Sequence, residues 1–208
     1  MKLYHNPGWG SAIVEAQAAV LGMPCEVILA GEIYADPVAR AVLGRVNPLV
    51  QVPTLVLDNG EVMTESAAIT LYLSEVAGSP VLVPPSGDAD RAAFLRWLIF
   101  IVANIYPCYT YCDVPERFVS ATEGQAFQDK VTARCLDMWK VLAAESDRRG
   151  GPWVLGQRFT ALDIYVLFMV KWRPRRAVFD REVPMMGRIA DACAARPDLS
   201  GVMARNAE

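Results

Sequence analysis

Val52-Pro53 and Glu65-Ser66 are the two pairs of residues whose types and spacing point most directly to the binding of a small peptide. A cis Val52-Pro53 bond would reverse the chain and leave the Val52 N–H and C=O outside the sheet, free to pair with an extended ligand. A helix that opens at Ser66 offers free N–H groups and a positive dipole end, which suit a carboxylate. Glu65 has the wrong sign for a carboxylate, so we assign it to an ammonium group.

The chain between these pairs is predicted to form a β-hairpin followed by a helix. Thr54–Leu57 is an apolar run, Asn59-Gly60 tolerates the positive φ of a tight turn, and Glu61–Met63 returns as the second strand. Apolar residues then recur at helical spacing between Ala68 and Leu73. Taken singly, each piece is more typical of a structural turn and a capped surface helix. Their order and spacing favour a binding site.

Together, the proline, the hairpin and the acid-hydroxyl pair resemble the glutathione site in the thioredoxin-like domain of the glutathione transferase superfamily. The resemblance implies glutathione as co-substrate, with its cysteinyl part paired to Val52 beside Pro53. It also implies that the helix start at Ser66 binds the γ-glutamyl carboxylate and that Glu65 binds the γ-glutamyl ammonium. Gln51 resembles the residue that commonly binds the glycyl carboxylate, and its alternative is a solvated loop position.

The composition excludes several other classes of function. The 208 residues carry 20 Lys and Arg against 23 Asp and Glu, and this net charge of −3 gives no basic field for nucleic acid. No apolar run reaches the roughly 18 residues that span a bilayer, and the amino-terminus resembles no secretory signal. We therefore expect a cytoplasmic protein without a membrane span. The 53% hydrophobic content favours helices buried on several faces or a subunit interface.

Metal and disulfide chemistry are not expected either. The five cysteines form an odd set without a C-x-x-C motif, and the chain has a single histidine, His5. Neither a disulfide framework nor a zinc site is indicated by this pattern. We expect a metal-free protein.

The amino-terminal part of the chain has the element order of a thioredoxin-like domain. A strand at 2–5, a helix with Ser11 as its N-cap, and a strand at 25–29 form a β-α-β unit. A weaker helix, the hairpin and the helix from Ser66 complete the order β-α-β-α-β-β-α. The predicted parts are a thioredoxin-like glutathione-binding domain (1–78), a Gly-, Pro- and Ser-rich linker (79–89), and an all-α domain with the electrophile pocket (90–208).

The remainder of the chain shows no strand alternation and is predicted to be helical. A long apolar helix at 91–111 should kink at Pro107, where a main-chain hydrogen bond is missing. A second helix covers 123–149. Thr160 and Asp163 then form the reciprocal capping pair of a third helix. This segment resembles the capping box in the helical domain of glutathione transferases.

The loop after the first strand departs from the superfamily at the catalytic position. There a hydroxyl or thiol holds the glutathione sulfur as thiolate, because a thiol of pKa about 8.5 to 9 is mostly protonated at pH 7. The segment looks most like the bacterial beta class, whose cysteine is replaced by Gly10, while theta-like and omega-like patterns place Ser or Cys at Gly8. The remaining candidates are Ser11, Tyr106 and His5. Their structural alternatives are a plain N-cap, a core aromatic residue and a buried histidine.

Electrophile sites in such proteins are apolar and lie between the domains. The residues predicted to line one are Trp9, Tyr106, Tyr109 and Trp172. Helical aromatic residues are more often part of a core, which is the alternative for each of them.

The sequence therefore predicts a glutathione transferase-like enzyme that conjugates the glutathione thiol to a small hydrophobic electrophile. Gly8 and Gly10 leave open a homologue that binds glutathione or a partner with little catalysis, and a glutathione-dependent reductase or isomerase is a variant within the same fold. We expect a homodimer, since the helices that begin at Ser66 and Arg91 have more apolar surface than one small domain buries. The family's arrangement brings a polar side chain of the partner's long helix towards the γ-glutamyl group, and Asn104 of the partner subunit is the candidate.

Overall fold

The computed structural model describes residues 1–207, which fold as two compact units. The first unit contains Met1–Val83 together with the carboxy-terminal segment from Cys193, and the second contains Pro84–Ala192. The division after Val83 falls inside the linker predicted at 79–89. The fold class is the predicted one, a thioredoxin-like domain followed by an all-helical domain.

The sheet of the first unit has four strands in the order β2-β1-β3-β4. Their bounds are β1 Lys2–His5, β2 Glu26–Leu29, β3 Thr54–Val56 and β4 Val62–Met63. β1 pairs in parallel with β2 and antiparallel with β3, which in turn pairs antiparallel with β4. In this register Leu3 lies opposite both Val27 and Leu55.

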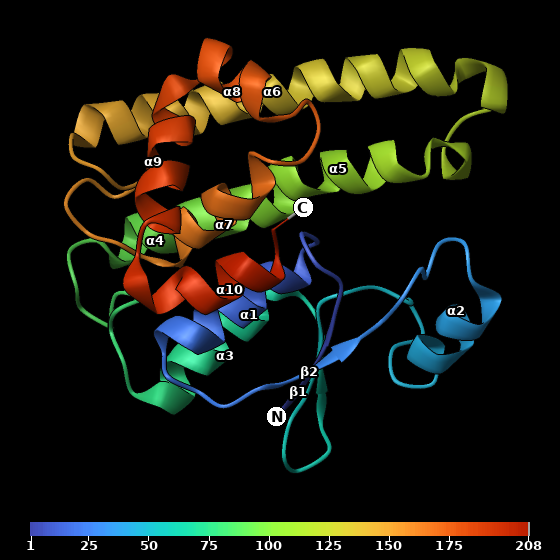
Figure 1. Cartoon of the computed structure of the whole chain (residues 1–208). Coiled ribbons are helices and arrows are strands. Elements are labelled where there is room, and N and C mark those ends of the chain that lie inside the picture. Colours follow the sequence, from blue (N-terminus) through green and yellow to red (C-terminus); the bar gives the residue numbers. More distant parts are fainter. Residues whose placement is uncertain (208) are drawn as a thin grey trace. The chain divides into compact units, whose positions relative to one another are not determined.

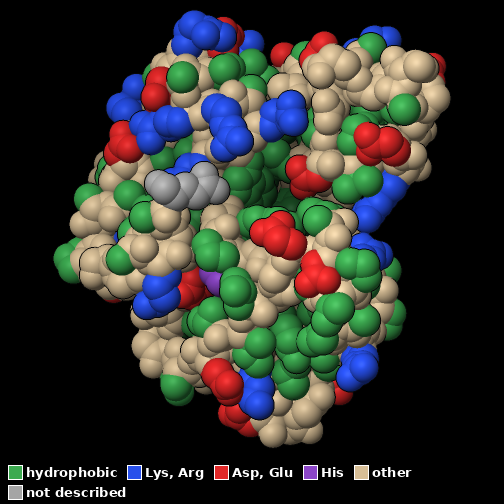
Figure 2. Space-filling model, turned by 45° about the vertical axis from the view of Figure 1, so that its right-hand side comes forward, with side chains coloured by type: hydrophobic (Ala, Val, Ile, Leu, Met, Phe, Trp, Pro, Cys, Tyr) green, Lys and Arg blue, Asp and Glu red, His purple; other side chains and the backbone are tan. Residues whose placement is uncertain are grey.

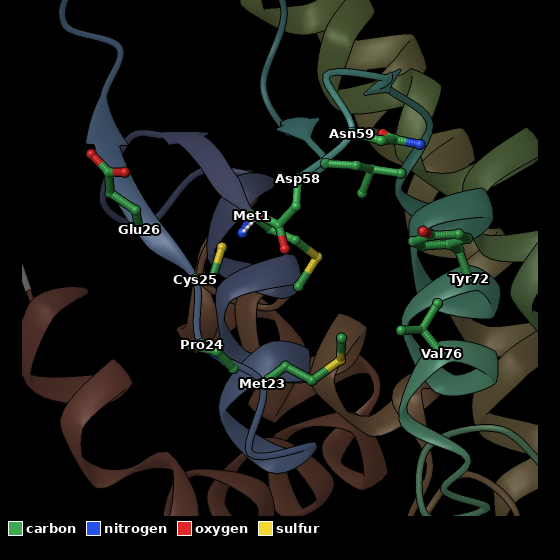
Figure 3. Close-up of a pocket in the computed structure, with 10 residues that line it drawn as sticks. Met1, Met23, Pro24, Cys25, Glu26, Asp58, Asn59, Tyr72 and Val76 are labelled. Carbon is green, nitrogen blue, oxygen red and sulfur yellow. Dashed lines mark hydrogen bonds and ion pairs between the residues drawn. The ribbon is translucent and has the colours of Figure 1, made fainter.

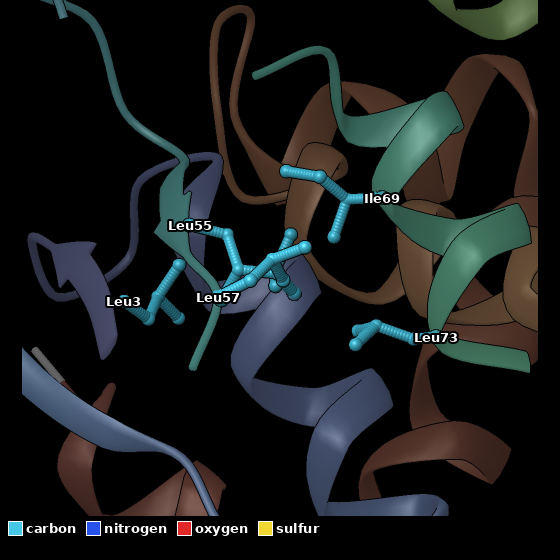
Figure 4. Close-up of a cluster of buried hydrophobic side chains, with 6 residues drawn as sticks. Leu3, Leu55, Leu57, Ile69 and Leu73 are labelled. Carbon is cyan, nitrogen blue, oxygen red and sulfur yellow. The ribbon is translucent and has the colours of Figure 1, made fainter. Parts of the chain in front are cut away.

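Helices cover both faces of this sheet. α1 (Ser11–Val20) and α3 (Ser66–Ala77) lie side by side on one face (Figure 1). The core between them and the sheet is a cluster of buried aliphatic side chains, drawn in Figure 4: Leu3, Val14, Leu55, Leu57, Ile69 and Leu73. α2 (Pro37–Gly44) is associated with a smaller cluster that includes Leu43 and packs against Tyr4, whose side chain points to the face opposite Leu3.

The carboxy-terminal segment belongs to the first unit, which corrects its predicted placement in a helical domain at 90–208. Its 3₁₀ turn η4 (Pro197–Leu199) and helix α10 (Ser200–Arg205) pack against α1. Leu199 and Val202 are buried there. The physical reason is that α1 has a second apolar side that the sheet does not cover.

The second unit is helical throughout its regular structure, apart from isolated bridges near Trp153. Its elements are α4 (Arg91–Phe100), η1 (Ile101–Ile105), α5 (Tyr106–Asp113), η2 (Pro115–Arg117), η3 (Ala121–Glu123), α6 (Gly124–Arg149), α7 (Ala161–Met169), α8 (Arg176–Glu182) and α9 (Pro184–Ala194). The helices predicted at 91–111, at 123–149 and from Thr160 are present, and α8, α9 and the short turns η2 and η3 are additional.

The long helix accommodates Pro107 in a way that the sequence did not predict. A π-helical turn, η1, ends at Ile105, two residues before the proline, and the Tyr106 N–H bonds to the Ile101 carbonyl. Arg91–Asp113 is long and apolar enough to cross a membrane by length and composition, with a mean hydropathy of 1.4 over its most apolar window, of which 39% is buried. Core helices of proteins without a membrane span meet the same criterion.

The capping pair of α7 is confirmed. The Thr160 hydroxyl accepts the Leu162 N–H at 3.3 Å, and the Asp163 carboxylate accepts the Thr160 N–H at 2.7 Å. A further N–H, from Val154, reaches the other carboxylate oxygen at 2.8 Å. The Thr160 hydroxyl also donates to this carboxylate at 3.3 Å. Asp163 is fully buried, and this burial raises its pKa to about 7 against the opposing effect of its hydrogen bonds.

Removal of this carboxylate is expected to destabilise the fold more than loss of an exposed cap. Asp163→Ala leaves the buried N–H groups of Val154 and Thr160 without a partner and should lower the free energy of unfolding by about 3 kcal/mol. Asp36→Ala, the matched control, removes one exposed capping bond to the Val38 N–H and should cost about 1 kcal/mol or less. Urea denaturation of the full chain measures both. Equal losses would contradict the account.

Candidate functional site

The strand register brings three segments to one edge of the sheet. Tyr4 pairs with Thr54, so the loop after β1 lies beside the start of β3. Leu55 pairs with Met63, so the chain that follows β4 returns towards the same edge before α3 begins. The side chains of Trp9 and Val52 pack against one small core cluster, which confirms that the loop and the residues before β3 are neighbours.

Val52 presents its main chain at this edge. The Val52-Pro53 bond is cis, as predicted. Val52 itself lies outside β3 and is half-buried, and no hydrogen bond to its N–H or C=O occurs within residues 1–207. A donor and an acceptor from one residue are therefore available side by side, as they are on the edge of a strand.

Asn47 holds the residues before Val52 in place, and sequence reasoning missed it. It is 3% exposed, and its Nδ2 donates to the Gln51 carbonyl at 3.1 Å and to the Thr54 hydroxyl at 3.0 Å. The same hydroxyl donates to the Gln51 carbonyl at 2.7 Å. The Gln51 side chain remains exposed. The signal that could have found this clamp is the Asn47-Pro48 dipeptide, which is typical of turns.

Two residues with strained backbones flank the site. Val50 has φ 53° and Glu65 has φ 63°, values in a region that residues other than glycine rarely adopt. For a β-branched residue such as Val50 the cost is highest. Strain of this kind persists where the surrounding structure imposes it, and it is concentrated at functional sites.

The start of α3 offers a second set of polar groups. Ser66 is the first residue of this helix and 9% exposed, and no partner of its hydroxyl is found among the described residues. Glu65 occupies the N-cap position with an exposed side chain, which receives a 3.4 Å hydrogen bond from the Thr64 hydroxyl and makes no capping bond. The N–H groups of the first turn, the Ser66 hydroxyl and the Glu65 carboxylate can thus bind the two charged ends of an amino acid.

Ser11 is placed differently from the sequence prediction. Gly10 takes the N-cap position of α1, and Ser11 is the first helical residue and fully buried. Its hydroxyl accepts the Asn6 N–H at 3.0 Å and donates to the Asn6 carbonyl at 3.3 Å. The Asn6 side chain in turn exchanges two hydrogen bonds with Gly31, at 2.8 and 3.1 Å. The predicted N-cap bond of Ser11 is not made. Its hydroxyl instead closes the loop between Asn6 and Ser11 through these two hydrogen bonds.

The loop also carries an aromatic stack. The rings of Trp9 and Tyr34 lie 5.3 Å apart and 22° from parallel, with Trp9 half-buried and Tyr34 46% exposed. Tyr34 was not among the predicted residues. It follows β2 in a segment without periodicity, so no sequence signal links it to Trp9.

His5 is buried behind the loop. It is 3% exposed, and only a small patch of it shows on the face in Figure 2. Burial lowers the pKa of His5, although the Glu15 carboxylate, whose oxygen lies 3.8 Å from Nε2, favours the charged form and Arg205 disfavours it. His5 is thus a neutral residue of the interior at pH 7.

The other predicted aromatic residues meet in the second unit. The Trp172 ring makes edge contacts with the rings of Tyr106 and Tyr109, with ring centroids 5.3 Å and 5.1 Å apart. Tyr106 is half-buried, whereas Tyr109 is buried, and its hydroxyl accepts the Trp139 N–H at 2.9 Å. Burial raises the pKa of Tyr109 well above its usual range. Tyr109 is therefore a core residue with a satisfied hydroxyl.

A hollow of about 840 Å³ lies at the opposite end of the sheet (Figure 3). Its lining includes Met1, Met23, Cys25 and Tyr72, and none of the predicted site residues. The Met1 ammonium group bonds to Asp58 at 2.6 Å beside it. Across residues 1–207 no group of three His, Cys, Asp or Glu side chains is arranged to hold a metal ion.

Comparisons with known proteins point to one family. Residues 18–76 match the model of the family described as glutathione S-transferase, N-terminal domain. The uncharacterized GST-like protein YncG of Escherichia coli K12 is 35% identical over 99% of this chain and 98% of its own length.

Solved structures show the same fold. A glutathione transferase from Methylococcus capsulatus is 25% identical, covers 99% of this chain with 98% of its own, and superposes with a TM-score of 0.82. A sphingomonad glutathione S-transferase complexed with glutathione is 26% identical, with the same shares covered and a TM-score of 0.73.

The burial of His5 predicts a loss of stability in mild acid. Because its pKa is lowered in the folded state, the unfolded chain takes up a proton first as the pH falls below about 6.5. The contribution of neutral His5 is complete above that pH and is lost as the pH falls through the lowered pKa of the folded state. His5→Gln should therefore show a smaller fall in melting temperature between pH 7.5 and 5.5 than the wild type. His5 is the chain's one histidine, and the variant and the wild type differ only there. Equal falls in melting temperature would therefore contradict the prediction.

Proposed function

This chain belongs to the glutathione transferase superfamily, and from that premise we propose that it binds glutathione and transfers the glutathione sulfur to a small hydrophobic electrophile. The observation that carries the proposal is the main chain of Val52, whose N–H and C=O have no partner within residues 1–207 and stand beside the start of α3. Glutathione is an extended tripeptide with an amino acid at one end, and both features have a counterpart at this edge.

Each part of glutathione is assigned to a group of matching chemistry. The cysteinyl N–H and C=O pair with Val52 beside Pro53, as an added strand would. The γ-glutamyl carboxylate binds the Ser66 hydroxyl and the N–H groups of the first turn of α3, and Glu65 binds the γ-glutamyl ammonium. Gln51 is exposed next to Val52 and is assigned to the glycyl carboxylate.

The thiolate is assigned to main-chain donors. Glycine stands at positions 8 and 10, where related patterns have cysteine or serine. The Ser11 hydroxyl already exchanges hydrogen bonds with Asn6. The N–H groups of Gly10 and Ser11 stand at the amino-terminal end of α1, where an anion is stabilised without any side chain. Tyr106 is the side-chain alternative from the sequence and remains a prediction.

The reaction needs no other cofactor. The thiol loses its proton to solvent, and the thiolate sulfur attacks the electrophilic carbon and forms a C–S bond. A leaving group such as chloride departs with the bonding electron pair. The chain contributes a stabilised thiolate and a fixed position for the tripeptide. Apolar surface for the electrophile is assigned to Trp9, whose ring stacks on Tyr34. Tyr106 and Trp172 remain electrophile-pocket predictions from the sequence.

A glutathione-binding protein with little catalysis is the second candidate, and Gly8 and Gly10 favour it. The same two glycines disfavour a reductase that forms a mixed disulfide, because no thiol stands in the loop. A cytoplasmic location is also part of the proposal.

Glutathione binding should depend on the Ser66 hydroxyl. Ser66→Ala is expected to weaken binding by about 1–2 kcal/mol, since it removes a hydrogen bond to a charged group. Ser74→Ala is the matched control, because Ser74 is buried two turns along the same helix and its hydroxyl has no partner among the described residues. Calorimetry measures both affinities, and equal values for the two variants would reduce Ser66 to a helix residue.

Turnover separates the two candidate functions. Wild-type protein retained on immobilised glutathione is expected to conjugate at least one member of a panel that contains an aryl chloride, an alkyl halide, an epoxide and an enone. Retention without any product would support the binding protein. No retention would remove the basis of both.

A homodimer is also part of the proposal. Large apolar side chains remain exposed on both units, among them Val76 at 56% and Ile99 at 52%. Burying such surface favours association. Light scattering at micromolar concentration should give about twice 22.8 kDa. A monomer would contradict this, and the assignment of Asn104 of the partner subunit to the γ-glutamyl group would fall with it.

A further inference from the structure

Asn206, just after α10, reaches the loop that follows β1. Its side chain is 3% exposed, and Oδ1 accepts the Gly8 N–H at 2.9 Å. Its Nδ2 donates to the Glu15 carboxylate at 2.8 Å and to the Val202 carbonyl at 2.9 Å. All three partners belong to the first unit. A single amide therefore joins the loop, α1 and the carboxy-terminal helix.

Glu15 fixes the direction in which this amide points. Its carboxylate is 4% exposed, and it accepts the Arg205 Nε at 2.6 Å with one oxygen and the Asn206 Nδ2 with the other. A buried carboxylate accepts hydrogen bonds and donates none, so it holds the NH₂ side of Asn206 towards α1. The carbonyl side then faces Gly8. His5 is the other titratable group against this carboxylate, at 3.8 Å.

Gly8 is the position in the loop where such a hold has most effect. Its φ of 72° lies in the left-handed region, which glycine adopts without steric cost but also leaves readily. Asn6 is tied to Ser11 and to Gly31, and Gly8 lies between Asn6 and the thiolate donors assigned to Gly10 and Ser11. The bond from Asn206 fixes that stretch from outside the loop.

We propose that Asn206, oriented by Glu15, is a positioning residue that holds the glutathione-sulfur loop through the Gly8 amide. This inference rests on the proposed function for the identity of the ligand, and on the hydrogen bonds alone for the hold on the loop. The carboxy-terminal helix is thereby a part of the thiol site, although none of its side chains is assigned to glutathione.

The test uses single variants and their combination in the full chain. Asn206→Ala removes the acceptor for Gly8. Asn206→Asp keeps that acceptor but places a second carboxylate against Glu15. The double variant Glu15→Gln/Asn206→Asp exchanges donor and acceptor between the two side chains, keeps the net charge, and restores a bond between them. The bond from position 206 to the Val202 carbonyl is lost in both Asn206→Asp and the double variant, so a comparison of these two isolates the contact with position 15. Ser200→Ala is the control. It removes an exposed hydroxyl at the start of α10 that bonds to the Pro197 carbonyl.

Amide hydrogen exchange of the Gly8 segment is the first readout. Exchange should be about tenfold faster in Asn206→Ala and Asn206→Asp than in the wild type, and near the wild-type rate in Ser200→Ala. In the double variant it should be slower than in Asn206→Asp, because the bond between positions 15 and 206 is restored. A lower melting temperature with unchanged exchange at Gly8 would overturn the proposal, because Asn206 would then serve only to anchor the terminus. A double variant no better than Asn206→Asp would overturn the role of Glu15.

Kinetics with glutathione is the second readout. Both single variants at position 206 should raise the KM for glutathione about tenfold and shift the pH–rate profile of kcat/KM to higher pH, since the thiolate loses its aligned donors. An unchanged KM and profile despite faster loop exchange would also overturn the proposal. If the wild type itself fails to bind glutathione, the proposed function fails, and hydrogen exchange still decides whether Asn206 holds the loop.

Discussion

The packing of α1 and α3 against one face of the sheet is the constraint on which the rest of the first unit depends. Leu3 and Leu55 are cross-strand neighbours, and both point into the cluster that Ile69 and Leu73 complete from α3. A one-residue slip of β3 would turn its apolar side chains to the other face, so the register is fixed by burial. With the register fixed, the end of β1, the start of β3 and the start of α3 must meet at one edge.

Hydrogen bonds from buried amide side chains then set the conformation of the irregular segments at that edge. Asn47 fixes the Gln51 carbonyl, Asn6 ties the first loop to Gly31, and Asn206 holds Gly8. None of these segments has a strand partner that would otherwise fix its main chain. The same arrangement leaves the Val52 N–H and C=O without a partner within residues 1–207, whereas the Gln51 carbonyl beside them accepts two hydrogen bonds. On this contrast we propose Val52 as a ligand-binding residue.

Local patterns were sufficient to predict a large part of the fold and some of the site. The hairpin at Asn59-Gly60, the cis bond before β3 and the capping pair of α7 each lie within a few residues, so their physics is readable from the sequence. Asn206 and Glu15 are distant in sequence, and nothing in the pattern of α10 indicates which unit it packs on. The Ser11 hydroxyl bonds to Asn6 instead of capping α1, because Gly10 takes the N-cap position, and the sequence pattern does not distinguish Gly10 from Ser11 as the cap.

The central claim is that the edge formed by Val52, Ser66 and the loop after β1 binds glutathione, and amide chemical shifts recorded during a titration test it most directly. With ¹⁵N-labelled protein, addition of glutathione is predicted to shift the Val52, Ser66 and Gly10 amides most. Amides that line the hollow at the opposite end of the sheet, such as Cys25 and Asn59, should stay in place. The largest shifts at Cys25 and Asn59, or no shift at Val52 at saturating glutathione, would contradict the account.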